Sequence, residues 1–190
     1  MAAAEGDKEG SGTGPKLEDI KGRLSVLYSL SVVKIVIGVV CFALGIPTIV
    51  YTTANPTYPF SSGSGIYTGI EVILTGMFGI LTLNEAKSSD PTRLRCLLIT
   101  FRVFLSLGID VGAVQFAYGI WSSVICFRGD GGPTCGGVHH SANSLLAVFN
   151  MIVGLTILVV CLVSTVVGWQ PFKLFWKMGK VNDDVETIKA

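Results

Sequence analysis

Four long apolar stretches constrain what this chain can fold into more than any other feature of its sequence. They cover residues 29–51, 65–85, 96–121 and 144–169. Each is close to the roughly 20 residues that an α-helix needs to cross about 30 Å of hydrocarbon. The stretches are nearly continuous and lack the alternation of membrane β-strands. The sequence therefore predicts an all-α membrane protein, built as a four-transmembrane-helix bundle.

Composition agrees with a membrane protein and sets the domain organisation. Half of the residues are hydrophobic and 14% are charged, whereas about a quarter of a soluble domain is charged. A net charge of +1 gives no basic surface for nucleic acid, so the expected partner is the lipid bilayer. We expect a disordered cytoplasmic N-terminal tail at 1–28, a membrane domain at 29–169 and a cytoplasmic C-terminal tail at 170–190.

The distribution of basic residues predicts the orientation in the membrane. Lys and Arg in short loops resist translocation and mark the cytoplasmic side. They precede the first apolar stretch, separate the second from the third and follow the fourth: Lys16, Lys21, Arg23, Lys87, Arg93, Arg95, Lys173, Lys177 and Lys180. Residues 52–64 contain no Lys or Arg, and residues 122–141 contain only Arg128. Both termini are therefore predicted to be cytoplasmic.

Two cysteines are predicted to form a disulfide on the opposite side. Cys126 and Cys135 are close in sequence and face an oxidising compartment in this topology. Closing so short a loop stabilises the fold by about 2.5 to 3 kcal/mol in the chain-entropy model. Cys96 lies at the cytoplasmic boundary. Two alternatives remain for it there: S-palmitoylation, or an unmodified thiol.

The same outer loop contains the tripeptide Arg128, Gly129, Asp130, which integrin receptors read on adhesive proteins. Its glycines and Pro133 are typical of a tight turn. We prefer a structural turn to an adhesive site, and keep adhesion as the alternative.

Four ionisable residues fall within the predicted helices: Lys34, Glu71, Arg102 and Asp110. A charge at the centre of a membrane helix costs about 2.5 to 3.5 kcal/mol, so such residues usually face protein. Lys34 and Arg102 lie about two turns from the cytoplasmic side, near enough for their side chains to reach it. Glu71 and Asp110 lie deeper and are expected to turn inward.

The polar network has two interpretations. In the first, Lys34 or Arg102 pairs with an acidic residue and fixes the register of the helices. In the second, Glu71 and Asp110, with Thr75 and Gln115, provide a path for a cation. We prefer structural pairing.

Glycines supply faces on which membrane helices can approach closely, in the first three predicted helices: Gly38, Gly45, Gly65, Gly69, Gly76, Gly108 and Gly112. Several are four residues apart, the small-xxx-small pattern of helix contacts. These faces serve contacts within the bundle or between chains, and we favour self-association into a homo-oligomer.

Catalytic patterns are not found. The sequence has no P-loop, no metalloprotease pattern and no zinc-type cysteine spacing. His139 and His140 are adjacent and are expected to be solvated. We therefore predict no enzyme, no cofactor and no metal.

Two segments resemble a known family. LSVVKIVIGVVCFALGI with its central Gly38, and IYTGIEVILTGMFGIL with Gly69 and Gly76, are similar to the first and second helices of the membrane-spanning four-domain family. That family includes the B-lymphocyte surface antigen and the β chain of the high-affinity IgE receptor. The resemblance implies a plasma-membrane or endosomal protein that oligomerises and modulates a receptor or a calcium conductance.

The leading functional hypothesis follows from these points. We expect a non-enzymatic four-pass protein that self-associates and serves as an accessory subunit or organiser of receptor signalling complexes. The alternatives are an oligomeric cation channel that uses intramembrane acidic residues, and a four-span protein of vesicle trafficking.

Overall fold

The computed structural model describes residues 17–52, 63–86, 91–128 and 140–189, and these form four helices. They are α1 (Leu17–Thr52), α2 (Ser64–Glu85), α3 (Pro91–Arg128) and α5 (His140–Lys189). Each contains a segment long and apolar enough to cross a membrane: Gly22–Val50, Ser64–Glu85, Thr92–Arg128 and Ser141–Trp169. No strand occurs in these described ranges. The predicted all-α, four-span architecture is confirmed.

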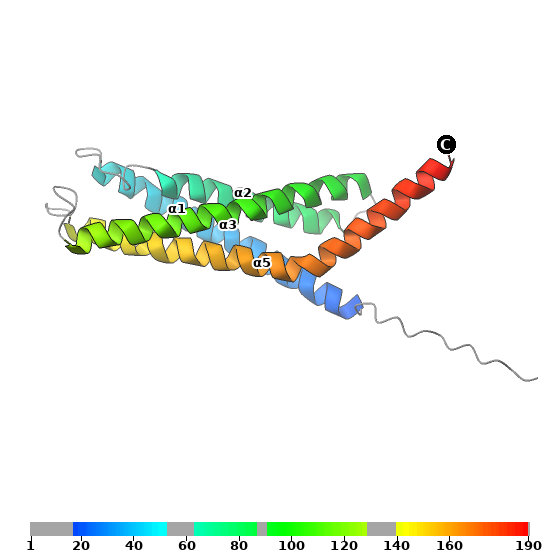
Figure 1. The fold of residues 1–190 in the computed structure, drawn as a ribbon, viewed down its shortest axis with the longest axis horizontal. Coiled ribbons are helices and arrows are strands. Elements are labelled where there is room, and N and C mark those ends of the chain that lie inside the picture. The colour runs from blue at the N-terminus through cyan, green and yellow to red at the C-terminus, as the bar shows by residue number, and fades with distance from the viewer. Residues whose placement is uncertain (1–16, 53–62, 87–90, 129–139, 190) are drawn as a thin grey trace, which may run out of the picture.

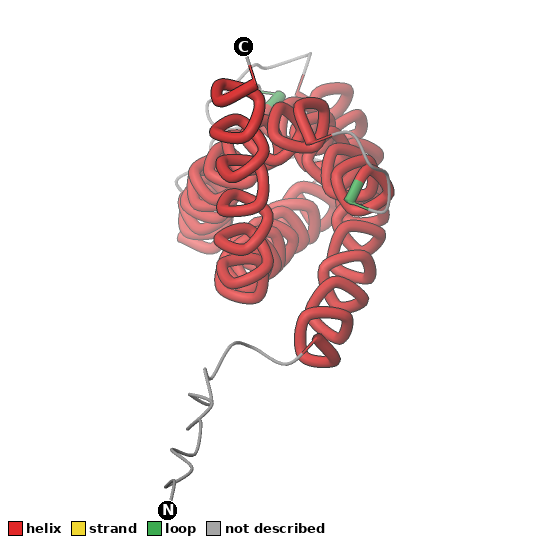
Figure 2. The backbone as a smooth tube through the Cα atoms, turned by 90° about the vertical axis from the view of Figure 1, so that its right-hand side faces the viewer, coloured by secondary structure: helices red, strands yellow, loops and turns green. Residues whose placement is uncertain are grey.

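The helices pack as a bundle in which each lies against two neighbours. α1 packs most extensively on α2 and α3 on α5, while α2–α3 and α1–α5 contacts close the ring. Figure 1 shows the helices running side by side, and Figure 2 shows them grouped around a common axis. Because lipid surrounds such a bundle, its outer surface is apolar, and Val36, Tyr67 and Val166 are among its exposed side chains.

The helices extend beyond the predicted apolar stretches. α1 begins at Leu17, within the segment expected to be a disordered tail, and α5 continues to Lys189 through the expected C-terminal tail. The expectation of disorder is wrong for 17–28, whereas the C-terminal tail, for which the sequence predicts no particular secondary structure, is helical at 170–189. Hydropathy marks the part of a helix that fits the hydrocarbon, whereas a helix can continue through polar residues outside it. α5 changes direction where it leaves the bundle, in the part coloured orange in Figure 1.

The buried residues of α1, α3 and α5 recur every three or four positions. In α1 they are Leu27, Ser31, Lys34, Gly38, Cys41 and Gly45. In α3 they are Leu98, Phe101, Leu105, Gly108, Gly112, Gln115, Gly119, Ser122 with its neighbour Ser123, and Cys126. α5 repeats the spacing with Asn143, Ala147, Gly154, Ile157, Cys161, Ser164 and Gly168. A repeat near 3.5 residues is the pattern of left-handed helix packing. It fixes which side of each helix faces the bundle.

The glycines lie where helices of the same chain meet. A Cβ added to Gly69 would lie 2.7 Å from the Phe42 nitrogen of α1, and one on Gly38 would lie 2.9 Å from the Gly69 oxygen of α2. Gly45, Gly65 and Gly76 also face the α1–α2 contact, while Gly108 and Gly112 face α5. These faces pack within the chain, so they do not support the preference for self-association through them. Close backbone approach is their structural role.

Candidate functional site

Lys34 on α1 is buried inside the bundle, with only 1% of its surface exposed. Its Nζ lies 5.3 Å from the centroid of the Phe101 ring and makes no hydrogen bond to the described residues. Lys34 therefore does not extend to the cytoplasmic face, although its depth would allow it. Its position between Ser31 and Gly38 places it on the packed side of α1, where its stem cannot turn toward lipid.

Glu71, on α2, contacts α3. Its Oε1 accepts a hydrogen bond from Thr75 Oγ1 at 2.8 Å, whereas Oε2 has no hydrogen-bond partner among the described residues. A Cβ on Gly108 would lie 3.5 Å from Oε2 and 3.0 Å from the sulfur of Cys161. Glu71 therefore turns inward, as expected, and packs directly on the backbone of α3.

Lys34, Glu71, Thr75 and Cys161 form what we call the central polar cluster. Lys34 lies within electrostatic range of Glu71 and of Cys161, although no direct ion pair joins it to Glu71. Opposite charges held in a poorly polarisable interior attract strongly even beyond contact distance. The cluster thus links α1, α2 and α5, and it agrees with structural pairing better than with an open cation path.

A second polar group links three helices farther along the bundle. Gln115 of α3 donates from Nε2 to Asn150 Oδ1 of α5 at 3.0 Å, and its Oε1 accepts from Thr68 Oγ1 of α2 at 3.4 Å. The sequence pattern alone does not single out Thr68 or Asn150 as members of a site. Asn150 is the signal that could have been used, since a lone amide in an apolar helix needs a partner.

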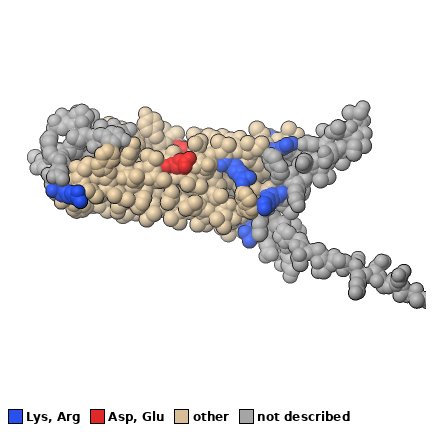
Figure 3. Space-filling view, in the orientation of Figure 1, with Lys and Arg blue, Asp and Glu red and all other residues tan. Residues whose placement is uncertain are grey.

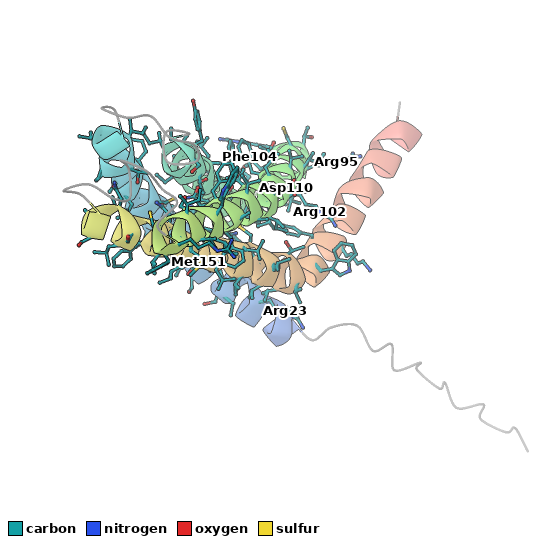
Figure 4. The ribbon with its side chains drawn as sticks, turned by 60° about the vertical axis from the view of Figure 1, so that its left-hand side comes forward. Arg23, Arg95, Arg102, Phe104, Asp110 and Met151 are labelled. Atoms are coloured by element: carbon teal, nitrogen blue, oxygen red, sulfur yellow. The ribbon has the colours of Figure 1, made fainter. Side chains whose placement is uncertain are left out.

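Asp110 does not join either group. It is exposed on the outer side of α3, and no hydrogen bond or ion pair from the described residues reaches its carboxylate. Figure 4 shows it on α3, beyond Arg102 along the bundle. The expectation that Asp110 turns inward is wrong. It is two positions from inward-facing Gly108, which places it on roughly the opposite side of the helix.

Basic side chains gather toward the end of the bundle at which α1 begins, which we call the basic end. Arg23, Arg95 and Arg102 are labelled there in Figure 4, and most of the basic surface on the visible face of Figure 3 is at that end. Arg102 points outward and its Cζ lies 4.7 Å from the centroid of the Trp169 ring of α5. Lys173 Nζ lies 5.0 Å from the same ring.

The cysteines divide into two groups. Cys41, Cys96 and Cys161 are free thiols, whereas Cys126 is not. Cys126 is buried against Ala147 near the last turn of α3. Cys135 lies outside the described residues, so its pairing with Cys126 stays a prediction. Cys96 is exposed near the start of α3, and its palmitoylation also stays a prediction.

Selective labelling tests the disulfide and the topology together. A membrane-impermeant maleimide added to intact cells is expected to label Cys126→Ser, which frees Cys135, and to leave the wild type unlabelled until reductant is added. Cys96 should react only after permeabilisation, with Cys96→Ser as the control. Loss of the bridge should lower the free energy of unfolding by about 2.5 to 3 kcal/mol. Labelling of Cys96 from outside would invert the topology, and labelling of wild-type Cys135 without reductant would exclude the bridge.

The tripeptide Arg128, Gly129, Asp130 lies only in part within the described residues. Arg128 is exposed in the last turn of α3, so the connection to α5 begins later than the predicted Ser122. Gly129, Asp130 and His139 lie outside the described residues, as does the side chain of His140. The turn and the adhesive alternative therefore stay predictions.

Neither metal-ligand geometry nor similarity to known proteins identifies the chain. Within the part of the chain that the structure describes, no three His, Cys, Asp or Glu side chains form a group that could hold a metal ion. No family model matches the sequence, and neither a curated protein nor a solved structure matches it. The resemblance to the membrane-spanning four-domain family stays a prediction.

Proposed function

We propose that this multi-pass membrane protein is a non-enzymatic assembly subunit: it docks beside other membrane proteins and organises or modulates receptor complexes. The observation that carries the proposal is the outward-facing Asp110 on α3. The proposed location is the plasma membrane, with endosomal or other vesicle membranes as the alternative.

Asp110 lies halfway along the apolar span Thr92–Arg128 and is exposed to the region that lipid would fill. A carboxylate at that depth costs about 2.5 to 3.5 kcal/mol on insertion scales, and such residues almost always face protein. The described residues provide it with no partner. A helix from another chain that covers Asp110 would remove this cost.

The surface around Asp110 is suited to such a helix. Ser106, Ala113 and Ala117 are on the same side of α3, spaced three or four residues apart. Small side chains allow a second helix to approach closely, and a Lys, Arg or hydroxyl at the depth of Asp110 would pair with it. We call these four residues the Asp110 face.

The chemistry of this face favours a different protein over a second copy. A two-fold dimer through the Asp110 face would bring two carboxyl groups together, which disfavours ionisation of both. A partner helix with a basic residue avoids that conflict. Self-association remains part of the proposal, but the glycine faces that first suggested it lie within the bundle.

The cation-channel alternative has less support. It required Glu71 and Asp110 to contribute to one path, but Glu71 packs on the inner side of α3 at Gly108 and Asp110 is on the outer side. Cation flux through the reconstituted wild type that is lost in the Glu71→Gln variant would reinstate the channel hypothesis.

Site-specific photocrosslinking in intact cells tests the assembly proposal. A photoreactive residue in place of Ala113 should give a crosslinked band with a second membrane protein, whereas one in place of Thr156, exposed on α5, should not. Adding Asp110→Leu should reduce the Ala113 band at least about fivefold, since a pairing of this kind contributes about 1 kcal/mol or more. Recovery of only a monomer, or an Asp110→Leu variant that crosslinks as well as wild type, would contradict the proposal. A band of twice the chain mass would assign the face to a second copy.

A further inference from the structure

We propose that the groove between α3 and α5 at the basic end is a binding site for one anionic glycerophospholipid. Arg102 and Lys173 would hold the headgroup phosphate, and the apolar wall would hold the start of an acyl chain. This inference does not depend on the assembly proposal: its binding groups are Arg102 and Lys173, and of the Asp110 face only Ser106 also lines the groove.

The groove is large enough to hold part of a lipid, and its lining is partly apolar and partly cationic. Its volume is about 790 Å³, and its apolar wall includes Ile99 and Val103 of α3 and Phe172 of α5. The remaining lining includes Arg102, Trp169 and Lys173 but no acidic residue. A site with an apolar wall and a cationic end fits a ligand that has an anionic head and a hydrocarbon chain.

The side chains of Arg102 and Lys173 both lie next to the ring of Trp169. Arg102 Cζ and Lys173 Nζ each lie within about 5 Å of the Trp169 centroid, at 4.7 and 5.0 Å. Lys173 follows Trp169 by one helical turn on α5, whereas Arg102 comes from α3. Two positive charges that both border this ring repel each other, and none of the described acidic side chains forms an ion pair with either. A shared phosphate would offset this repulsion and connect the two helices.

The depth of the groove selects a lipid over a soluble anion. The apolar stretch of α5 ends at Trp169 in the sequence, where Gln170 and Lys173 follow, which places the ring and its two cations at the boundary between hydrocarbon and headgroups. Trp is enriched at that level of a bilayer. The predicted topology places the basic end at the cytoplasmic leaflet, in which anionic lipids are concentrated. The groove therefore opens where an anionic lipid is present at high local concentration.

Native mass spectrometry of the full chain in mild detergent tests this site. Phosphatidylserine and phosphatidylcholine with identical acyl chains serve as probes. The wild type is expected to retain one phosphatidylserine about tenfold better than phosphatidylcholine, and Arg102→Gln with Lys173→Gln should abolish that preference. The matched control, Arg23→Gln with Arg95→Gln, removes two charges at the same end that do not line the groove, and should keep it.

Two further measurements distinguish a lipid site from general surface attraction and from a simple phosphate site. Val103→Trp should fill the groove and reduce phosphatidylserine retention without changing charge. Glycerophosphoserine and inorganic phosphate should not displace the lipid at equal concentration. Equal retention of both lipids by the wild type, equal loss in the control pair, or displacement by either soluble phosphate would overturn the proposal. The first outcome would show that the charge of the headgroup is not recognised, the second would indicate general surface attraction, and the third a simple phosphate site.

Discussion

Replacing Gly154 by alanine is expected to lower the free energy of unfolding of the bundle by about 3 kcal/mol, the upper end of the range for overpacked cores. A Cβ at this position would lie 2.5 Å from the nitrogen and 2.8 Å from the Cα of Phe116. Both are backbone atoms of α3, so no side-chain rotation relieves the collision. α5 would have to move away from α3 and lose packing along the most extensive interface of the bundle.

Replacing Gly119, a glycine of α3 that faces α5, by alanine is expected to lower the free energy of unfolding by a similar amount. A Cβ on Gly119 of α3 would lie 2.5 Å from the Cα of Met151 on α5. Gly22→Ala is the matched control, since nothing lies within 4 Å of a Cβ there. It should leave stability unchanged or raise it by up to about 1 kcal/mol through helix propensity. Thermal unfolding in mild detergent, followed by loss of the monodisperse peak in size exclusion, measures all three. A Gly154→Ala variant as stable as Gly22→Ala would contradict the helix contact.

The four-span fold could be predicted from the sequence because length and hydropathy determine it almost alone. The ends of the helices could not. α1 begins at Leu17 and α3 continues to Arg128, beyond the apolar limits, because leaving the hydrocarbon does not end a helix. Only a change in backbone conformation does so. α2 shows one at its start, where Gly63 has φ 64°, a conformation that other residues rarely adopt.

The orientation of Lys34 could have been read from a spacing visible in the sequence. Gly38 and Gly45 are one heptad apart, and continuing their pattern toward the N-terminus passes through Lys34 and Ser31. The possibility that Lys34 reaches the cytoplasmic face rests on its depth and not on its side of the helix. Depth determines how far a lysine must reach to water, whereas the helical repeat determines whether a neighbouring helix prevents it.

The same reasoning applies to α3, whose two sides have different roles. Gly108 and Gly112 face α5, so Asp110 between them must face outward. The helical repeat alone gives that orientation. The contacts of Arg102 with Trp169 and of Gln115 with Asn150 required the structure. The pattern within one helix gives its inner side but not the helix that lies against it.

Lys34→Met and Glu71→Gln are expected to destabilise the bundle singly and to compensate each other when combined. Methionine keeps the length of the lysine stem, and glutamine keeps the acceptor for Thr75 Oγ1. Each single change leaves one buried ionisable group without its electrostatic partner, at a cost of about 1 to 3 kcal/mol. The double variant should unfold close to wild type, because replacing both members of a buried pair by uncharged groups of similar shape is often neutral.

A second double-mutant cycle, in which Arg102 takes the place of Lys34, tests whether the compensation is specific to Lys34 and Glu71. Arg102→Met removes a cation from the same half of the bundle, but its guanidinium lies on Trp169 and faces outward. Its effect should add to that of Glu71→Gln without compensation, since separated sites behave independently. Chemical unfolding in mild detergent measures the free energy of unfolding of every variant in both double-mutant cycles. If Lys34→Met and Glu71→Gln prove additive, or if Lys34→Met alone is as stable as wild type, the two groups do not stabilise each other. Lys34 would then be held inside the bundle by its position in the helical repeat and its contact with Phe101 alone.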